Sequence, residues 1–235
     1  MDAVLPQAGS GALGLVLLDT RFPRPPGDAG NPASWPCPVR TRVVEKAWPD
    51  RVVTTAQALR ESGLAARFAQ ALRDLRAEGC TALTTSCGFL VLLQRELQDA
   101  VDVPVVTSSL LLLPGLLQRA PQVGVLTISA ANLTADFLLA AGVPQARIAD
   151  VVVQGVEPSG EFAGAILGNR PHMDIERARA DVVEAARALR QRAPHIATVV
   201  LECTNMPPYA QAVRAATGLE VLSLQDCFTC ASAAR

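Results

Sequence analysis

Short apolar runs alternate with longer amphipathic stretches along most of the chain. Runs rich in Val, Ile and Leu are typical of strands buried in a parallel sheet, and apolar residues spaced three or four apart predict helices that cover it. The sequence predicts strands at residues 13–18, 39–44, 81–85, 104–106, 123–127, 148–153, 198–201 and 220–222. This alternation predicts an α/β fold class.

Three stretches between the strands have a helical pattern. Residues 64–75 place large apolar side chains at spacings of four, four and three, and residues 175–189 repeat this stripe with a polar outer face. A third pattern covers residues 130–141. We expect these stripes to pack against the sheets, so they carry no functional signal.

The two halves of the chain repeat one pattern. Cys87 follows a predicted strand and Val105 lies 18 residues later, and Cys203 and Val221 keep that spacing 116 residues further on. We therefore expect two quasi-symmetric lobes, each a mostly parallel sheet flanked by helices, with the active site in the cleft between them. The first lobe is expected to hold residues 1–110 plus 217–235, and the second lobe residues 111–216.

One segment breaks the repeat. Residues 19–38 contain six Pro and two Gly, whereas the second half has a helical pattern after its first strand. Long loops at the carboxyl ends of strands often shape a binding site. We expect this loop to cover the mouth of the cleft and to become ordered when substrate binds, at an entropy cost that its prolines limit.

The six cysteines direct attention to the strand ends. Cys87 and Cys203 each follow a strand, where parallel sheets bind ligands and where the N–H groups of a following helix lower a thiol pKa. Two opposed thiols suit the removal of a proton from one face of a carbon and the return of a proton to the other face. Core packing is the alternative role of a buried Cys, and we assign it to Cys37, Cys80, Cys227 and Cys230. Cys227 and Cys230 form a lone C-x-x-C, for which a redox pair or half of a zinc site is the other interpretation.

Charge and composition exclude several classes of partner. Lys and Arg together number 21 and Asp and Glu 22, so the net charge of −1 gives no basic footprint for nucleic acid or a membrane surface. No apolar run approaches the roughly 20 residues of a spanning helix. The N-terminus lacks the parts of an export signal, which predicts a cytoplasmic protein with reduced thiols. Two His and one Lys predict no metal and no pyridoxal phosphate.

The two cysteine motifs resemble those of the aspartate/glutamate racemase superfamily, a cofactor-independent group that includes hydantoin racemases, maleate isomerases and arylmalonate decarboxylase. The resemblance lies in the stretches 84–89 and 203–207 and in Leu18–Arg24 with Pro26–Asp28. It implies that Cys87 and Cys203 are the catalytic acid and base. The substrate-binding residues that it implies, together with two polar residues of the 19–38 loop, are Ser86, Gly88, Phe89, Ser129, Thr204, Asn205, Asp19 and Arg21.

The sequence thus predicts a racemase that inverts the α-carbon of an amino acid or related carboxylate, with aspartate or glutamate as the default substrate and no cofactor. Departures from the glutamate racemase motifs, Gly88-Phe89 after the first Cys and Asn205 after the second, leave the substrate open. Arg21 or Arg24 is a candidate for binding a distal carboxylate, or else a solvated loop charge.

Three alternatives use the same residues. A maleate-isomerase-like enzyme keeps both cysteines, whereas the decarboxylase pattern has Gly at the position of Cys87. A non-catalytic carboxylate-binding protein would need no lowered thiol pKa. The oligomeric state stays open, with homo-oligomerisation as one outcome.

Overall fold

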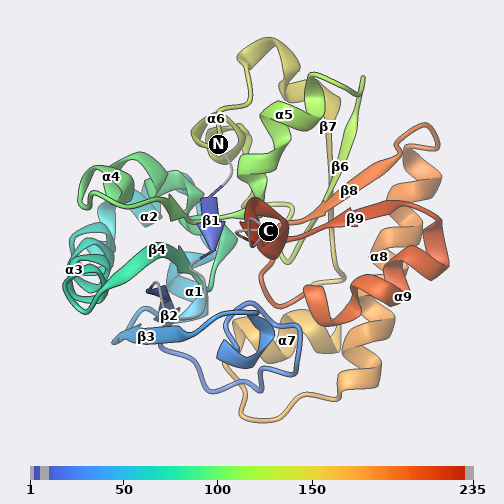
Figure 1. The fold of residues 1–235 in the computed structure, drawn as a ribbon. Coiled ribbons are helices and arrows are strands. Elements are labelled where there is room, and N and C mark those ends of the chain that lie inside the picture. Colours follow the sequence, from blue (N-terminus) through green and yellow to red (C-terminus); the bar gives the residue numbers. More distant parts are fainter. Residues whose placement is uncertain (1–2, 6–10, 231–235) are drawn as a thin grey trace, which may run out of the picture.

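Two four-stranded parallel sheets form the framework of the molecule, which we describe from a computed structural model covering residues 3–5 and 11–230. The first sheet has the order β3-β2-β4-β5 and the second β7-β6-β8-β9 (Figure 1). Their bounds are β2 (Ala12–Leu18), β3 (Val39–Val44), β4 (Cys80–Thr85), β5 (Val105–Val106), β6 (Val123–Thr127), β7 (Val151–Gly155), β8 (Thr198–Leu201) and β9 (Glu220–Leu222). The identical order of corresponding strands confirms the predicted pair of quasi-symmetric α/β lobes.

The burial of each strand follows from its place in the sheet. Central β2 is apolar and almost fully buried, as expected for a strand covered on both faces. Edge strand β3 has the sequence Val-Arg-Thr-Arg-Val-Val; Arg40, Arg42 and Val43 are exposed, and only Val44 is buried. These patterns explain why both strands could be recognised from sequence.

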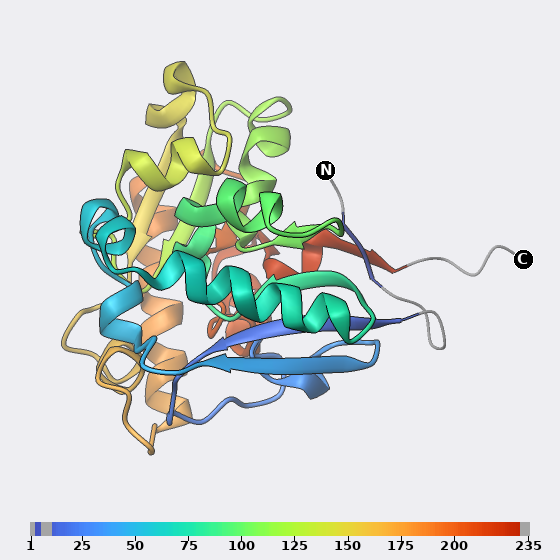
Figure 2. The same cartoon turned by 90° about the vertical axis from the view of Figure 1, so that its left-hand side faces the viewer.

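Helices cover the outer faces of both sheets, and Figure 2 shows α3 lying across the first. The buried stripe of α3 and that of α8 match the predicted helical patterns. Asp174 caps α8 by accepting hydrogen bonds from the N–H groups of Glu176 and Arg177. The helices are α1 (Pro49–Val52), α2 (Ala56–Glu61), α3 (Leu64–Ala77), α4 (Gln94–Asp99), α5 (Leu113–Leu117), α6 (Ala135–Ala140), α7 (Glu161–Leu167), α8 (Ile175–Arg192) and α9 (Ala210–Thr217).

Glycine lets the main helix of each lobe approach the central strand. A Cβ atom on Gly14 would lie 3.1 Å from Leu75 Cβ of α3, and one on Gly124 would lie 2.8 Å from Leu189 Cδ2 of α8. The same close contact thus occurs at corresponding places in both lobes.

Two predicted elements differ from the structure. The strand expected at 148–153 begins only at Val151, because Pro144 starts a 3₁₀ helix over Gln145–Asp150 and Arg147 bonds the carbonyls of Leu117 and Ala120. The helix expected at 130–141 is shortened to α6, because the chain first turns and Asn132 donates a hydrogen bond to the carbonyl of Val53 in the other lobe.

The C-terminal part of the chain corrects one part of the predicted lobe division. Strand β9 pairs with β8, so residues 220–222 belong to the second sheet and not to the first lobe. A third, two-stranded parallel sheet joins β1 (Ala3–Leu5) to β10 (Phe228–Cys230). Within the described residues, no helix has the length and apolar character needed to span a bilayer.

Candidate active site

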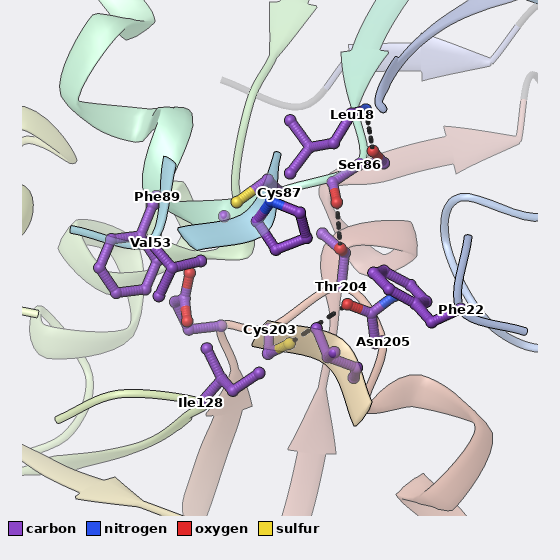
Figure 3. Close-up of a pocket in the computed structure, with 14 residues that line it drawn as sticks. Leu18, Phe22, Val53, Ser86, Cys87, Phe89, Ile128, Cys203, Thr204 and Asn205 are labelled. Carbon is purple, nitrogen blue, oxygen red and sulfur yellow. Dashed lines mark hydrogen bonds between the residues drawn. The ribbon is translucent and has the colours of Figure 1, made fainter. Parts of the chain in front are cut away.

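Cys87 and Cys203 occupy equivalent places at the carboxyl ends of β4 and β8. Ser86 separates Cys87 from its strand, and Glu202 separates Cys203 from the other. Figure 3 shows the two thiols on opposite walls of one pocket. Both side chains are buried, and both line a pocket whose walls come from the two lobes. A pair of thiols therefore lies in the cleft between the lobes, as expected.

The pocket between the thiols is narrow and mostly apolar. Its cavity measures about 20 Å³, room for about one water molecule. Both lobes and the 19–38 loop contribute to its walls. The lining residues are Leu18, Phe22, Pro49, Val53, Ser86, Cys87, Gly88, Phe89, Ile128, Ile166, Glu202, Cys203, Thr204 and Asn205.

Two hydroxyl groups beside the cysteines hold the backbone together. Ser86 Oγ accepts a hydrogen bond from the N–H of Leu18 at 3.1 Å, and Thr204 Oγ1 donates to the carbonyl of Ser86 at 2.7 Å (Figure 3). The second bond crosses from one lobe to the other. Ser86 and Thr204 therefore fix the two cysteine turns relative to each other.

A chain of polar contacts runs from the 19–38 loop to Cys203. Arg24 Nη1 donates to Asp28 Oδ1 at 2.8 Å, and Asp28 Oδ2 accepts from Asn205 Nδ2 at 2.7 Å. Because the amide nitrogen faces Asp28, the amide oxygen faces Cys203 and accepts from its thiol at 3.6 Å. The loop is thereby tied to the second cysteine motif, and the N–H of Ala29 adds a bond to the carbonyl of Thr204.

Glu202, the residue before Cys203, faces the same pocket. The carboxyl group is 1% exposed, and Oε2 accepts a hydrogen bond from Thr127 Oγ1 at 2.7 Å. Oε1 is buried and has no hydrogen-bond partner in the part of the chain that the structure describes. Burial raises the pKa of Glu202 to about 7, against the opposing effect of the Thr127 hydrogen bond.

The thiol pKa values correct the expectation of lowered values. Burial raises the pKa of Cys87 to about 12, with a further contribution from the negative charge of Glu202. The same two causes raise the pKa of Cys203 well above its ordinary value. The N–H groups of Phe89 and Leu90 oppose the rise at Cys87, but they do not outweigh desolvation.

The remaining predicted residues divide into two groups. Gly88 and Phe89 line the pocket, and the ring of Phe89 packs edge-on against Phe137 of α6 at 4.9 Å between centroids. The residues outside the lining are Asp19, Arg21 and Ser129.

Those three residues have other contacts. Asp19 Oδ2 accepts from the N–H of Lys46, and exposed Arg21 donates its N–H to Asn169 Oδ1. Ser129 takes part in a turn in which its carbonyl accepts from Leu133. Arg24 also lies outside the lining, since its guanidinium bonds Asp28 and Thr20 and stacks over Phe22.

Two pocket features were not assigned from the sequence. Asp28 does not line the pocket but holds the pocket residue Asn205, and in the sequence only its four-residue spacing from Arg24 indicates the ion pair between them. The apolar walls come from segments far apart in sequence, so no local motif marks them. Over the described residues, no cluster of three or more His, Cys, Asp or Glu side chains is arranged to hold a metal ion.

Solved structures with the same arrangement come from one superfamily. Arylmalonate decarboxylase superposes with a TM-score of 0.58 at 15% identity, covering 92% of this chain and 88% of its own. Glutamate racemase from Francisella tularensis gives 0.58 at 15% identity (93% and 78% covered), and allantoin racemase from Pseudomonas fluorescens gives 0.53 at 18% (92% and 86%). The protein thus has the fold of the aspartate/glutamate racemase superfamily, which confirms the resemblance found in the sequence.

Curated relatives define the family more narrowly, although no protein-family model matches the chain. A dimethylsulfoniopropionate lyase from Durusdinium sp. clade D is 32% identical over 224 residues, which cover 92% of this chain and 72% of that protein. Dimethylsulfoniopropionate lyases 5 and 7 of Emiliania huxleyi are 29% and 28% identical, over 93% and 89% of this chain but only 44% and 63% of theirs. The chain belongs to the dimethylsulfoniopropionate lyase family and is an enzyme on the racemase scaffold.

Proposed function

We propose that this enzyme is a lyase that cleaves dimethylsulfoniopropionate, or a closely related β-sulfonio carboxylate, by β-elimination. The proposal rests on the alignment of nearly the whole chain with relatives named for that reaction. It replaces the racemase activity expected from sequence as the preferred activity. Both reactions begin with removal of a proton from the carbon beside a carboxylate, which is why one scaffold can serve both.

The elimination needs one base and a leaving group. A thiolate at Cys87 or Cys203 takes the proton on the carbon next to the carboxylate, and the electrons of that C–H bond form the new C=C bond. The bond between the next carbon and sulfur breaks, and sulfur keeps its electron pair. The products are neutral dimethyl sulfide, acrylate and one proton, which passes from the thiol to solvent.

A buried thiol must ionise before it can act. The positive sulfonium group of the substrate lowers the thiol pKa when it enters, since a nearby cation favours the thiolate. The raised pKa values of the Cys87 and Cys203 thiols are therefore compatible with a base that ionises only beside its substrate.

The pocket walls favour this substrate over a dicarboxylate. The described residues that line the pocket include no Arg, Lys or His, so the lining has no cation to bind the side-chain carboxylate of aspartate or glutamate. Apolar walls such as Phe22, Val53 and Ile128 suit methyl groups on sulfur. We assign the single carboxylate of the substrate to the backbone N–H groups of residues 88–89 and 204–205.

The direct test is product formation from dimethylsulfoniopropionate. Purified protein should release dimethyl sulfide, measured in the headspace by gas chromatography, and equimolar acrylate, measured by proton NMR. Of C87S and C203S, the variant that removes the base should lower the rate at least 100-fold without loss of folding. Release of no dimethyl sulfide by a folded wild-type protein would overturn the lyase proposal.

Racemisation is a second candidate, because the two thiols come from opposite lobes and face one pocket. A racemase would exchange the α-hydrogen of a single-enantiomer amino acid for deuterium in deuterated water while its circular dichroism decays. Such exchange without dimethyl sulfide release would favour this candidate over the lyase.

A further inference from the structure

One carboxyl oxygen of Glu202 is buried without a hydrogen-bond donor among the described residues. Glu202 is 1% exposed to solvent, and the other oxygen accepts a hydrogen bond from Thr127. A buried ionised carboxylate needs paired charge or hydrogen bonds to offset the loss of hydration. Oε1 of this buried carboxyl group is therefore without a hydrogen bond from the described part of the chain.

The orphaned oxygen lies beside the reacting groups. A Cβ atom placed on Gly88, the residue after Cys87, would be 2.3 Å from Glu202 Oε1. Glu202 also lines the pocket together with both thiols, and its charge acts on both of them. Any ligand held between the thiols therefore lies within reach of this oxygen.

No protein cation is placed to neutralise Glu202. The described lining of the pocket contains no basic side chain, and the nearby Arg24 is already bonded to Asp28 and Thr20. The counter-charge must then come from the ligand. The ionised form of Glu202 is thereby matched by a ligand that is cationic at the end that meets it.

The surroundings also restrict the kind of cation. A primary ammonium carries three N–H donors that each need an acceptor, but the second oxygen of Glu202 is already bonded to Thr127. A methylated cation has no such donors and rests its methyl groups on apolar walls. The pocket supplies those walls in the rings of Phe22 and Phe89.

We propose that Glu202 is the specificity-determining residue that binds the methylated onium group of the substrate, and that it selects this group over both a neutral group and a primary ammonium. The inference deepens the proposed function and rests on it. The interaction belongs to the bound substrate, because the positive charge disappears as the C–S bond breaks. Removal of the Glu202 charge should accordingly raise KM without lowering kcat.

The test compares three carboxylate ligands in the intact protein by calorimetry, of which the first two have the same shape. They are 3-(trimethylammonio)propanoate, which carries a methylated cation and a poor leaving group, its neutral carbon analogue 4,4-dimethylpentanoate, and 3-aminopropanoate with a primary ammonium. The wild type should bind the methylated cation at least tenfold more tightly than either of the others. E202Q, which keeps the size of the side chain, should bind it no more tightly than the neutral analogue.

Glu220 offers a matched control. It is also a Glu of the second sheet that accepts a hydrogen bond from a Thr on the adjacent strand, Thr198 Oγ1 at 2.8 Å. It lies at the other end of that sheet, outside the lining of the thiol pocket. E220Q should keep the wild-type preference for the methylated cation. If E220Q loses this preference, the net charge of the protein decides binding and the proposal is overturned.

Turnover supplies the second readout. With dimethylsulfoniopropionate, E202Q should raise KM at least tenfold without lowering kcat. A large loss of kcat with an unchanged ligand preference would overturn the inference in favour of a proton-transfer role. The ligand comparison needs no turnover, so absence of lyase activity would refute the proposed function, while loss of preference in E202Q would still support the recognition of a methylated cation.

Discussion

Gly88 and Glu202 are in contact across the cleft. A Cβ atom on Gly88 would lie 2.3 Å from the carbonyl oxygen of Glu202 and 2.3 Å from its Oε1. The first of these atoms is backbone and cannot rotate away. The turn that carries Cys87 can therefore approach the end of β8 only with glycine at position 88.

The G88A variant tests this contact. Adding one methyl group should push the two cysteine turns apart and lower the free energy of unfolding by about 1–3 kcal/mol, the usual effect of overpacking. Catalytic activity should fall further, since the spacing of the thiols changes. Urea denaturation and initial rates measure the two effects.

A glycine with open space provides the control. Gly115 lies in α5, and a Cβ atom there meets nothing within 4 Å. G115A should be neutral or raise the unfolding free energy by up to about 1 kcal/mol, because Ala is the better helix former. Equal destabilisation by both variants would contradict the proposed contact.

The ion pair between Arg24 and Asp28 should be important for stability. Asp28 is 1% exposed and the Arg24 side chain 13%, so D28N leaves a largely buried guanidinium without its carboxylate. We expect a loss of about 3 kcal/mol in unfolding free energy, as for other broken buried pairs. Asn205 should also lose its fixed orientation toward Cys203, which lowers the rate of reaction.

Arg95 and Asp99 form an ion pair with the same four-residue spacing on an exposed helix. The side chains are 96% and 72% exposed, and D99N should change the unfolding free energy by no more than about 0.5 kcal/mol. Chemical denaturation of both variants makes the comparison. If D28N lowers the unfolding free energy as little as D99N does, Asp28 does not hold the 19–38 loop in place.

Glu202 should make the stability of the protein decrease with rising pH. Its pKa is near 4.5 in the unfolded chain and about 7 in the folded protein, so the folded state binds more protons between these values. The stabilisation is complete below about pH 4.5 and is lost as the pH rises through about 7. The difference of about 2.5 pH units corresponds to about 3 kcal/mol.

The E202Q variant isolates this contribution. The unfolding free energy of the wild type minus that of E202Q should fall by about 3 kcal/mol between pH 4.5 and pH 8. The thiols that face Glu202, Cys87 and Cys203, stay protonated over this range because their pKa values are raised. A difference that is constant with pH would mean that Glu202 is ionised throughout.

The thiol of Cys87 should react slowly with alkylating reagents in the absence of substrate. With a pKa of about 12, its thiolate fraction grows about tenfold for each pH unit across the range from 7 to 10. Peptide mass spectrometry after iodoacetamide treatment measures this rate, with the partly exposed Cys37 as an internal reference. A plateau in the Cys87 rate below pH 9 would be incompatible with the raised pKa.

The fold could be predicted because it depends on periodic patterns. Strands such as Val39–Val44 and Thr198–Leu201 match the prediction residue for residue, and the repeat around the two cysteines located the cleft. The shortened helix at 130–141 could not be foreseen, since its first turn is replaced by a contact of Asn132 with Val53, 79 residues away.

The charge environment of the site was less predictable. The placement of Glu202 toward the pocket depends on how the chain turns after β8, and the thiol pKa values depend on burial by both lobes. The motifs identified the turns that carry the cysteines, but not what covers them. Long-range packing decides whether an N–H group or the loss of water dominates the ionisation of a thiol.

The size of the pocket has a consequence for the measured affinity. A cavity with room for about one water cannot contain dimethylsulfoniopropionate, the substrate that we propose, which has eight non-hydrogen atoms. Its binding would therefore select conformations in which the walls have separated. If the open form makes up a fraction f of the protein, the apparent Kd is the intrinsic Kd divided by f. A substitution that loosens the bonds between the 19–38 loop and Thr204 would tighten apparent binding by enlarging f, even though it touches no atom of the ligand.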